Sequence, residues 1–316
     1  MALYRTYSDY LKEKYNEKVY KIPIALPVTC PNRDGTLDSD GCIFCGSIRA
    51  DYETKAVGME ITHQIDRSIS HVGPKYKAKK FIAYFLNFTN TYMPLSRFEY
   101  CVKEACGHPD IVGLAVSTRP DCIHESYLEV LREAQGKYGT NVTVELGLQS
   151  VNPHTLLKIG RCHTVAEFID AALQIGRYHF DLCAHIIADL PWDDRIDVEE
   201  AAKLVSVLPV TEIKIHSLYI IKGTKLAKMY EKGDIKLLPP EEYAERVVLI
   251  LSMLRPDIVV QRIVGRASAN TLSVNGGRPW WEVKEYIEKL MRNRHIQQGS
   301  ACNYLHRAAV RRFLHE

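Results

Sequence analysis

Short apolar runs rich in β-branched and aromatic residues alternate along this chain with amphipathic segments of helical length. The runs cover residues 18–26, 80–86, 111–117, 141–148, 181–190 and 211–221. A further run at 257–265 offers a seventh strand. Strands that alternate with helices at this spacing indicate βαβ units around a parallel sheet. Six units are too few for a closed eight-stranded barrel, so we expect a partial, TIM-like (β/α)6 barrel or an open doubly wound sheet.

The other segments complete one domain rather than adding a second. The 316 residues can bury a full core, and no internal repeat or low-complexity linker interrupts them. We therefore predict a helical lead-in at 1–17, a catalytic core at 18–265, and a basic extension at 266–316 that packs on the barrel. Within the core, Asp197 is expected to cap a helix that starts at Val198.

Composition excludes several classes of protein. The hydrophobic share of 46% and the charged share of 25% are typical of a globular protein, and the net charge of +3 permits an anionic partner. No apolar run reaches the roughly 18 residues of a membrane helix, and no signal-peptide pattern opens the chain, so we expect no membrane association. The nine cysteines are odd in number and scattered, which favours the reducing cytoplasm over a secreted disulfide scaffold.

Three cysteines, Cys30, Cys42 and Cys45, lie in one polar loop directly after the first predicted strand. Ligands gather at the carboxyl ends of the strands in both candidate architectures, so this loop lies at the functional end. Metal binding and redox chemistry are both open to such a cluster. Structural zinc takes four ligands, yet no second C-x-x-C pair accompanies Cys42 and Cys45. A [4Fe–4S] cluster usually takes four thiolates, and three would leave one iron open to a ligand that is not protein.

Motifs along most of the chain resemble the YhcC/YtqA family of radical S-adenosylmethionine (SAM) proteins. They lie at residues 30–36, 41–45, 89–92, 117–122, 144–150 and 214–233. The core is also similar to the radical SAM domain of the catalytic subunit of Elongator. Its TRPD, ELGxQS and RGHT elements match residues 118–121, 145–150 and 161–164, with Cys162 in place of the glycine of the last element.

The resemblance implies the cofactors. In radical SAM enzymes three cysteines hold a [4Fe–4S] cluster, and the amino and carboxylate groups of the methionine moiety of SAM chelate the open iron. The usual spacing is C-x3-C-x2-C, with an aromatic residue before the last cysteine. Here Phe44 and the C-x2-C half match, whereas eleven residues separate Cys30 from Cys42. By this resemblance Cys30, Cys42 and Cys45 are the cluster ligands.

Two strands of the family's fold supply further expectations. Glu145 stands in an otherwise apolar run, where the resemblance implies that it faces the cofactor and accepts hydrogen bonds from ribose hydroxyls or the methionyl amine. A structural ion pair is the alternative, because a buried carboxylate needs partners. Gln149 is expected to assist. After the fifth strand, Asp189 and Trp192 stand where the family has glycines.

Four more residues are predicted to bind cofactor. Arg119 and Arg161 each offer a planar fork that suits a carboxylate or a phosphate. Thr89 and Asn90 follow the second strand, where radical SAM enzymes usually hold the methionyl amino group with a Gly-Gly-Glu turn. These two residues therefore match the family by position only.

Basic side chains follow the last strands and recur in the extension. They are Lys214, His216, Lys222, Lys225, Arg262, Arg266, Arg292, Arg294, His295, Arg307, Arg311 and Arg312. We expect them either to form a phosphate-binding rim around the barrel mouth or to be an ordinary solvated face.

The resemblance implies an enzyme that generates a 5′-deoxyadenosyl radical and draws electrons from a one-electron reductant such as flavodoxin or ferredoxin. The YtqA branch is linked to tRNA, where it converts 5-carboxymethylaminomethyl-uridine at the wobble position to 5-aminomethyl-uridine. Two alternatives stay open. One is radical SAM chemistry on a small metabolite, as in coproporphyrinogen dehydrogenases. The other is a non-catalytic, metal-dependent RNA-binding module, which would need a fourth ligand and no cofactor pocket.

Overall fold

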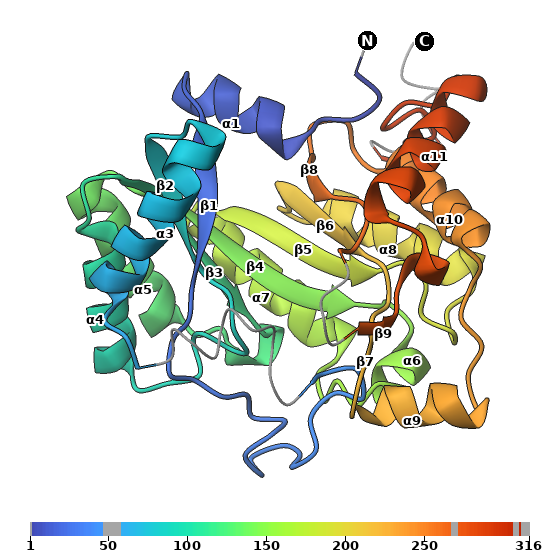
Figure 1. Ribbon diagram of the computed structural model, residues 1–316, viewed down its shortest axis with the longest axis horizontal. Helices are drawn as coiled ribbons and strands as arrows, with labels where there is room; N and C mark the ends of the chain where they lie inside the picture. Colours follow the sequence, from blue (N-terminus) through green and yellow to red (C-terminus); the bar gives the residue numbers. More distant parts are fainter. Residues whose placement is uncertain (1, 47–57, 267–270, 306–309, 311–316) are drawn as a thin grey trace.

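A parallel sheet of seven strands, in the order β1-β2-β3-β4-β5-β6-β8, forms the centre of the molecule (Figure 1). The computed structural model describes residues 2–46, 58–266, 271–305 and 310. The strands are β1 Val19–Ile24, β2 Lys80–Phe85, β3 Ile111–Thr118, β4 Asn141–Gln149, β5 Asp181–Ile187, β6 Glu212–His216 and β8 Val259–Arg262. This mixed α/β half-barrel confirms the partial barrel rather than the doubly wound sheet, and the run at 257–265 does supply a seventh strand.

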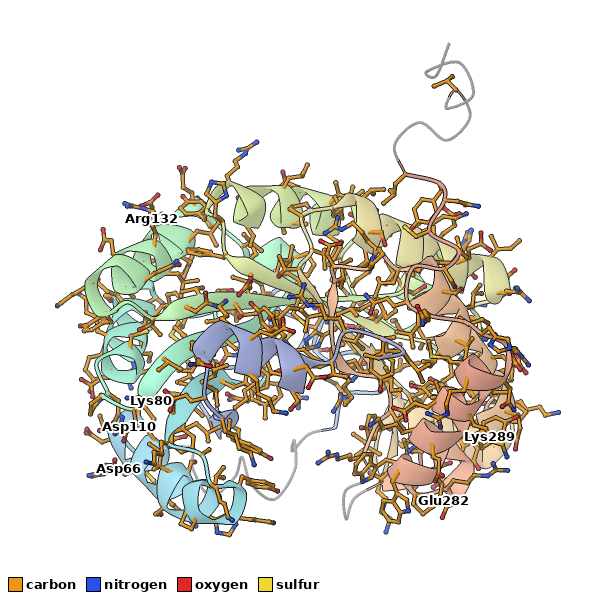
Figure 2. All side chains as sticks on the ribbon, turned by 90° about the horizontal axis from the view of Figure 1, so that it is seen from above. Asp66, Lys80, Asp110, Arg132, Glu282 and Lys289 are labelled. Atoms are coloured by element: carbon orange, nitrogen blue, oxygen red, sulfur yellow. The ribbon has the colours of Figure 1, made fainter. Side chains whose placement is uncertain are left out.

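Helices cover the outer face of the sheet and leave one side of the barrel open, as Figure 2 shows from above. They are α3 Ile61–Tyr76, α4 Leu95–Cys106, α5 Glu125–Tyr138, α7 Val165–Arg177, α8 Arg195–Val207 and α10 Pro240–Met253. The main core lies between these helices and the outward side chains of the strands, such as Ile22, Phe85, Leu114 and Leu146. None of the described helices is long and apolar enough to span a bilayer.

The predicted strand at 211–221 divides in two. β6 ends at His216, and the short β7, Ile220–Ile221, pairs antiparallel with β9, Thr271–Ser273. The intervening Ser217 is buried, and its hydroxyl donates to Asn275 at 2.7 Å and accepts from the Gly265 amide at 3.0 Å. This pairing holds the chain after β8 against the mouth of the barrel.

The N-cap of helix α8 lies three residues before the predicted cap. Asp194 is the N-cap, and its carboxylate accepts from the amides of Ile196 at 2.6 Å and Asp197 at 3.1 Å. Asp197 in turn accepts from the Asp194 amide at 2.9 Å, which completes a reciprocal capping box. The expectation that Asp197 is the N-cap is therefore wrong. Asp194 is the N-cap, and Asp197 is the third residue of the helix and completes the capping box.

Alternation along the strands places polar side chains inside the barrel. Because successive strand residues point to opposite faces, Ile22 enters the outer core while Lys21 points inward. On β4, likewise, Leu146 packs in the outer core and Glu145 points into the barrel. The barrel interior is therefore the polar side of a sheet whose outer side is apolar.

The first helix, α1 Tyr7–Tyr15, lies between the two edge strands. Thr6 bridges to Val260 of β8, and the Val260 amide donates to the Arg5 carbonyl at 2.8 Å. Leu11 packs with Val19 of β1 and with inward side chains of the sheet. At the other end of the chain, α11, Trp280–Asn293, packs on α10 through Val283 and Ile287.

Candidate active site

A cavity of about 430 Å³ lies at the carboxyl ends of the strands and is lined by Cys30, Cys42 and Cys45. The loop therefore brings together three thiols that are separate in the sequence, at the end of the sheet where the strand order predicts a ligand site. Nine residues are predicted from the sequence to bind the cluster or the cofactor, and seven of them line this cavity. They are the three cysteines with Thr89, Arg119, Gln149 and Arg161.

The C-x2-C half of the loop is anchored by backbone pairing to distant elements. The Ile43 amide donates to the Ile159 carbonyl at 3.1 Å, just after α6, Pro153–Lys158. The Ile43 carbonyl accepts from the Leu226 amide at 2.9 Å, in the first turn of α9, Lys225–Lys232. Ile43 is buried among apolar side chains of these segments, with Phe44 packed against them. The loop is thus held by the barrel rather than only by its own turns.

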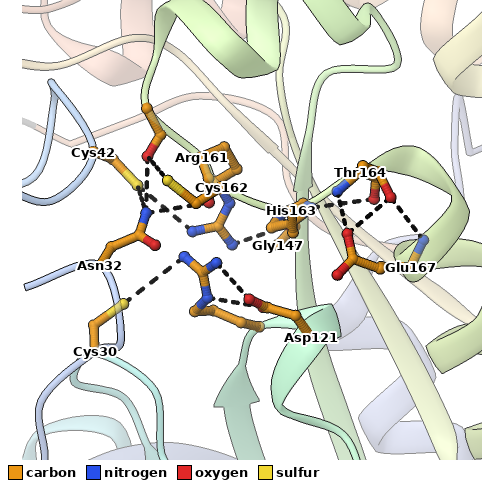
Figure 3. Close-up of polar contacts among 12 residues, drawn as sticks. Cys30, Asn32, Cys42, Asp121, Gly147, Arg161, Cys162, His163, Thr164 and Glu167 are labelled. Atoms are coloured by element: carbon orange, nitrogen blue, oxygen red, sulfur yellow. Dashed lines mark hydrogen bonds and ion pairs between the residues drawn. The ribbon is translucent and has the colours of Figure 1, made fainter. Parts of the chain in front are cut away.

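Nitrogen donors point at the sulfur atoms (Figure 3). Arg161 Nη1 lies 3.8 Å and Asn32 Nδ2 lies 3.6 Å from Cys42 Sγ. Arg119 Nη1 lies 3.9 Å from Cys30 Sγ. Two guanidinium groups beside the cysteines would complement the net negative charge of a thiolate-bound cluster. The Arg161 Nε and Asn32 Oδ1 atoms are buried without a hydrogen-bond partner among the described residues. Each can therefore form a hydrogen bond with a ligand bound beside the cysteines.

The three cysteine sulfurs do not form a compact single-ion site among the described residues. Tetrahedral zinc, with Zn–S bonds of about 2.3 Å, would bring thiolates within about 4 Å of one another. In the described part of the chain, the side-chain groups whose ligand atoms all lie within 4.8 Å of one another do not include the three cysteines. Three thiols beside cationic nitrogen donors are a set of groups that can hold a [4Fe–4S] cluster.

Polar groups that could hold SAM line the cavity beside the cysteines. Thr89, Ser117 and Thr118 come from the ends of β2 and β3, and Gln149 comes from the end of β4. A Cβ atom on Gly147 would lie 2.6 Å from Arg161 Nη2 and 2.7 Å from Gln149 Nε2. A larger residue at position 147 would therefore displace the ends of the Arg161 and Gln149 side chains. Hydroxyl and amide groups of this kind can bind a ribose or an amino-acid moiety.

Both arginines already donate hydrogen bonds to protein groups. Arg119 Nε and Nη2 donate to the two carboxylate oxygens of Asp121 at 2.8 and 2.7 Å. Arg161 Nη2 donates to the Gly147 carbonyl at 3.1 Å. Both arginines thus face the cysteine side of the cavity. Asp121 occupies the fork predicted for Arg119, whereas Arg161 keeps a buried Nε without a partner among the described residues.

Glu145 forms the ion-pair cluster that the sequence left open as its alternative. Its carboxylate accepts from Lys21, from Lys214 at 2.7 Å and from His185 Nε2 at 2.9 Å, and it is fully buried. Burial alone would raise the pKa of Glu145, but the two lysines outweigh it and hold that pKa well below the usual range. Glu145 is not among the residues that line the cavity, whereas its partners Lys214 and His185 are. Direct contact with a cofactor stays a prediction for Glu145.

Asn90 is also set back from the cavity. Its buried amide nitrogen donates to the carbonyls of Phe85 at 2.9 Å and Ser117 at 2.8 Å. These bonds join the ends of β2 and β3, next to Thr89, which does line the cavity. A cofactor contact by Asn90 likewise stays a prediction.

Sequence reasoning missed the polar chain inside the barrel. His216 Nε2 lies 3.3 Å from His185 Nδ1, and Arg262 Nη2 lies 2.5 Å from His216 Nδ1. Asp181, Cys183 and His185 alternate with apolar residues on β5, and this period of two was the available signal for an inward face. Of the predicted rim, Lys214, His216, Arg262 and Arg266 line the cavity, and Lys214 is buried within the barrel.

Some of the other predicted rim residues pair with acids, and others lie outside the described residues. Lys225 pairs with Asp40 at 2.6 Å, and Arg294 pairs with Glu245 through two contacts of 2.6 Å. These groups are therefore balanced by acids on the surface. Arg307, Arg311 and Arg312 lie outside the described residues.

The cavity is cationic. Six of the described residues that line it are arginine or lysine, and none of the described lining residues is aspartate or glutamate. The cations are Arg33, Arg119, Arg161, Lys214, Arg262 and Arg266. This lining favours an anionic ligand over a neutral or cationic one.

Comparison with known proteins agrees with this geometry. Residues 210–293 match the family described as Radical_SAM C-terminal domain. The chain is 35% identical to YtqA of Bacillus subtilis over 94% of this chain and 92% of that protein. It is 30% identical to YhcC of Escherichia coli K12, covering 92% and 93%. The archaeal Elp3 of Methanocaldococcus infernus has a similar fold, with a TM-score of 0.61 at 17% identity, over 89% of this chain and 64% of that one.

Proposed function

Because this chain belongs to the radical SAM family of YtqA and YhcC, we propose that it is a tRNA-modifying enzyme that converts 5-carboxymethylaminomethyl-uridine at the wobble position to 5-aminomethyl-uridine. The family implies SAM and a [4Fe–4S] cluster, for which Cys30, Cys42 and Cys45 are the proposed ligands. Flavodoxin or ferredoxin is the proposed electron donor.

One observation carries the proposal. The cavity that contains the three cysteines is lined by cations and, within the described residues, by no carboxylate. A substrate with a carboxylate on its reacting side chain and phosphates on its backbone complements such a site. The similarity to Elongator complex protein 3, 27% identical to the Drosophila protein over 48% of this chain, adds support for a tRNA substrate.

The proposed reaction balances in atoms and electrons. A cluster held by Cys30, Cys42 and Cys45, with SAM beside it, would supply a 5′-deoxyadenosyl radical able to take one hydrogen atom from the substrate. The carbon between the amine and the carboxylate suits this step, because the two groups donate and withdraw electron density at the resulting radical. One further electron passes from the substrate radical to the redox partner and leaves a protonated imine, whose nitrogen keeps its hydrogen. Addition of water then breaks the C–N bond, so that the aldehyde oxygen of glyoxylate comes from water and the nitrogen stays on the uridine.

The chain's own residues bind and orient the substrate. Cations at the cavity wall hold the carboxylate, and apolar side chains such as Ile187, Leu218 and Ile221 line the wall beside the reacting group. Neutral His185 and His216 are close enough to the wall to accept or relay a proton during hydrolysis of the imine. Burial lowers the pKa of His185 to about 4, so this imidazole is uncharged at neutral pH.

The test is an anaerobic incubation of the reconstituted enzyme with SAM, a reductant and tRNA that carries the carboxymethylaminomethyl group. Nucleosides from the digested tRNA are then measured by mass. We expect 5-aminomethyl-uridine and glyoxylate in equal amounts. If 5′-deoxyadenosine forms while the modified uridine is unchanged, the substrate proposal is wrong and a small anionic metabolite takes its place.

A further inference from the structure

Arg262, the last residue of β8, lies where two cavities meet. It lines the cysteine cavity and also a second cavity of about 690 Å³ between α1, the edge strands β1 and β8, and α11. Lys214 and Arg266 line both cavities as well. Within the described part of the chain, the second cavity too is lined by no carboxylate. A ligand that extends from one cavity into the other must pass these three cations.

The three cations differ in how their charges are balanced. Lys214 donates to the buried Glu145 carboxylate at 2.7 Å, so its charge is paired. Arg266 is exposed to solvent, and its guanidinium stacks on the Trp280 ring at 4.3 Å from the centroid. Arg262 is half-buried, and Nη2 donates to an imidazole nitrogen rather than to a carboxylate. Its Nε is buried without a partner among the described residues.

The imidazole contact orients Arg262 without neutralising it. A guanidinium has only donors, so His216 Nδ1 must be an acceptor, and His216 Nε2 must then carry the hydrogen that points to His185 Nδ1. His185 Nε2 in turn donates to Glu145 at 2.9 Å. Burial, with Arg262 nearby, lowers the pKa of His216 well below its usual value, which agrees with a neutral ring. The series of hydrogen bonds from Glu145 through His185 and His216 therefore fixes the orientation of the Arg262 side chain.

A half-buried guanidinium that is held in place and unbalanced by any described acid suits an anion from the ligand. From this placement we propose that Arg262 binds the carboxylate of the substrate and thereby determines its specificity. His216 is the positioning residue. The inference rests on the proposed function. It assigns to Arg262 the carboxylate fork that Arg119, which is bound to Asp121, does not offer in this structure.

The experiment compares two tRNAs that differ only in the carboxymethyl group, bound to the enzyme with cluster and SAM but without reductant, so that no turnover occurs. The parent should bind carboxymethylaminomethyl-tRNA more tightly than aminomethyl-tRNA. Arg262→Gln should weaken the former by about 10- to 100-fold, as expected for a charged hydrogen bond, and leave the latter nearly unchanged. Iron content and affinity for SAM report whether the variant has folded.

The outcomes test the substrate and the role of Arg262 separately. If the parent does not distinguish the two tRNAs, the proposed substrate is wrong. If the parent distinguishes them and Arg262→Gln does so equally well, only the role of Arg262 is wrong. An equal loss for both tRNAs would instead indicate a phosphate contact and would also overturn the inference.

His216 supplies the matched control for positioning. Asn at this position keeps an acceptor near the place of Nδ1, whereas Leu removes it. We expect His216→Asn to retain most of the preference for the carboxylated tRNA and His216→Leu to lose it. Equal preference in the two variants would show that His216 does not position Arg262. Arg278→Gln, which breaks only a surface pair with Glu241, should behave as the parent does.

Discussion

At the scale of single residues, the cysteine cradle combines thiols with cationic donors. Cys30 has Arg119 as its neighbour and Cys42 has Arg161, while Asp121 holds Arg119 in place. The acid belongs to the same short segment as the arginine, so one motif supplies both the charge and its alignment. Each arginine can thus stabilise negative charge on sulfur without a contact to the substrate.

The cysteines themselves give the first prediction. Changing Cys30, Cys42 or Cys45 to Ala should abolish the iron content of the anaerobically reconstituted protein, because the cluster loses one of its three proposed ligands. Cys162→Ala is the matched control, since this thiol is exposed close to the same loop. Iron and sulfide analysis gives the answer. Tight binding of one zinc and no iron by the parent would contradict the assignment.

The second prediction concerns Cys162, which replaces the glycine of the family motif. Its backbone has a φ of 56°, in the left-handed region that glycine adopts freely. Cys162→Gly should therefore raise the free energy of unfolding, by about 0.5–1 kcal/mol after the larger entropy of unfolded glycine is counted. Chemical denaturation measures the change. A less stable variant would show that the thiol contact with the Gly160 carbonyl outweighs the backbone strain.

At the scale of elements, the loops after β5 and β6 are joined by a buried acid. Asp189 Oδ1 accepts from the Leu218 amide at 2.7 Å. Trp192 packs against the apolar cluster around Ile43, below the cysteine loop. The two residues that replace the family's glycines therefore connect and fill this end of the barrel, and neither lines the cavity.

The third prediction uses the titration of Asp189. Burial raises its pKa to about 7 from an ordinary value of 3.8. The folded state thus holds this proton more tightly than the unfolded state, so stability falls as pH rises from about 4 to 7. Asp189→Asn keeps the acceptor and removes the charge. Its stability relative to the parent should increase between pH 5 and pH 8, by about 1–3 kcal/mol. Parallel stability curves over this range would contradict the assigned pKa.

At the scale of the whole molecule, the modest net charge of +3 conceals an uneven distribution. The second cavity is lined by seven lysines and arginines and by the aromatic rings of Tyr7, Tyr20 and Trp280. The cations are Lys12, Lys18, Lys21, Lys214, Arg262, Arg266 and Lys284. Cations interleaved with aromatic rings suit a nucleic-acid strand, so this open side of the barrel is the expected side for tRNA.

The fourth prediction compares two lysines with the same change of charge. Lys18→Glu, at the second cavity, should weaken tRNA binding and reduce the slope of log K against log salt by about 1, since about one phosphate contact is lost. Lys289→Glu, an exposed position on α11 that does not line this cavity, should have little effect (Figure 2). Equal losses in both variants would indicate non-specific electrostatics and contradict a defined tRNA side.

The alternation of strands and helices, the place of the cysteine loop after β1 and the family motifs could all be predicted from the sequence, because they depend on local periodicity and on residues near one another in the chain. Six strands and the seventh could be read in this way. The partners of Glu145 could not, since Lys21, Lys214 and His185 come from three other strands and meet it only through the register of the curved sheet. The same holds for Arg262 and His216, which are 46 positions apart. Side-chain pairing across a barrel interior is a property of closure and register, and only the tertiary structure decides it.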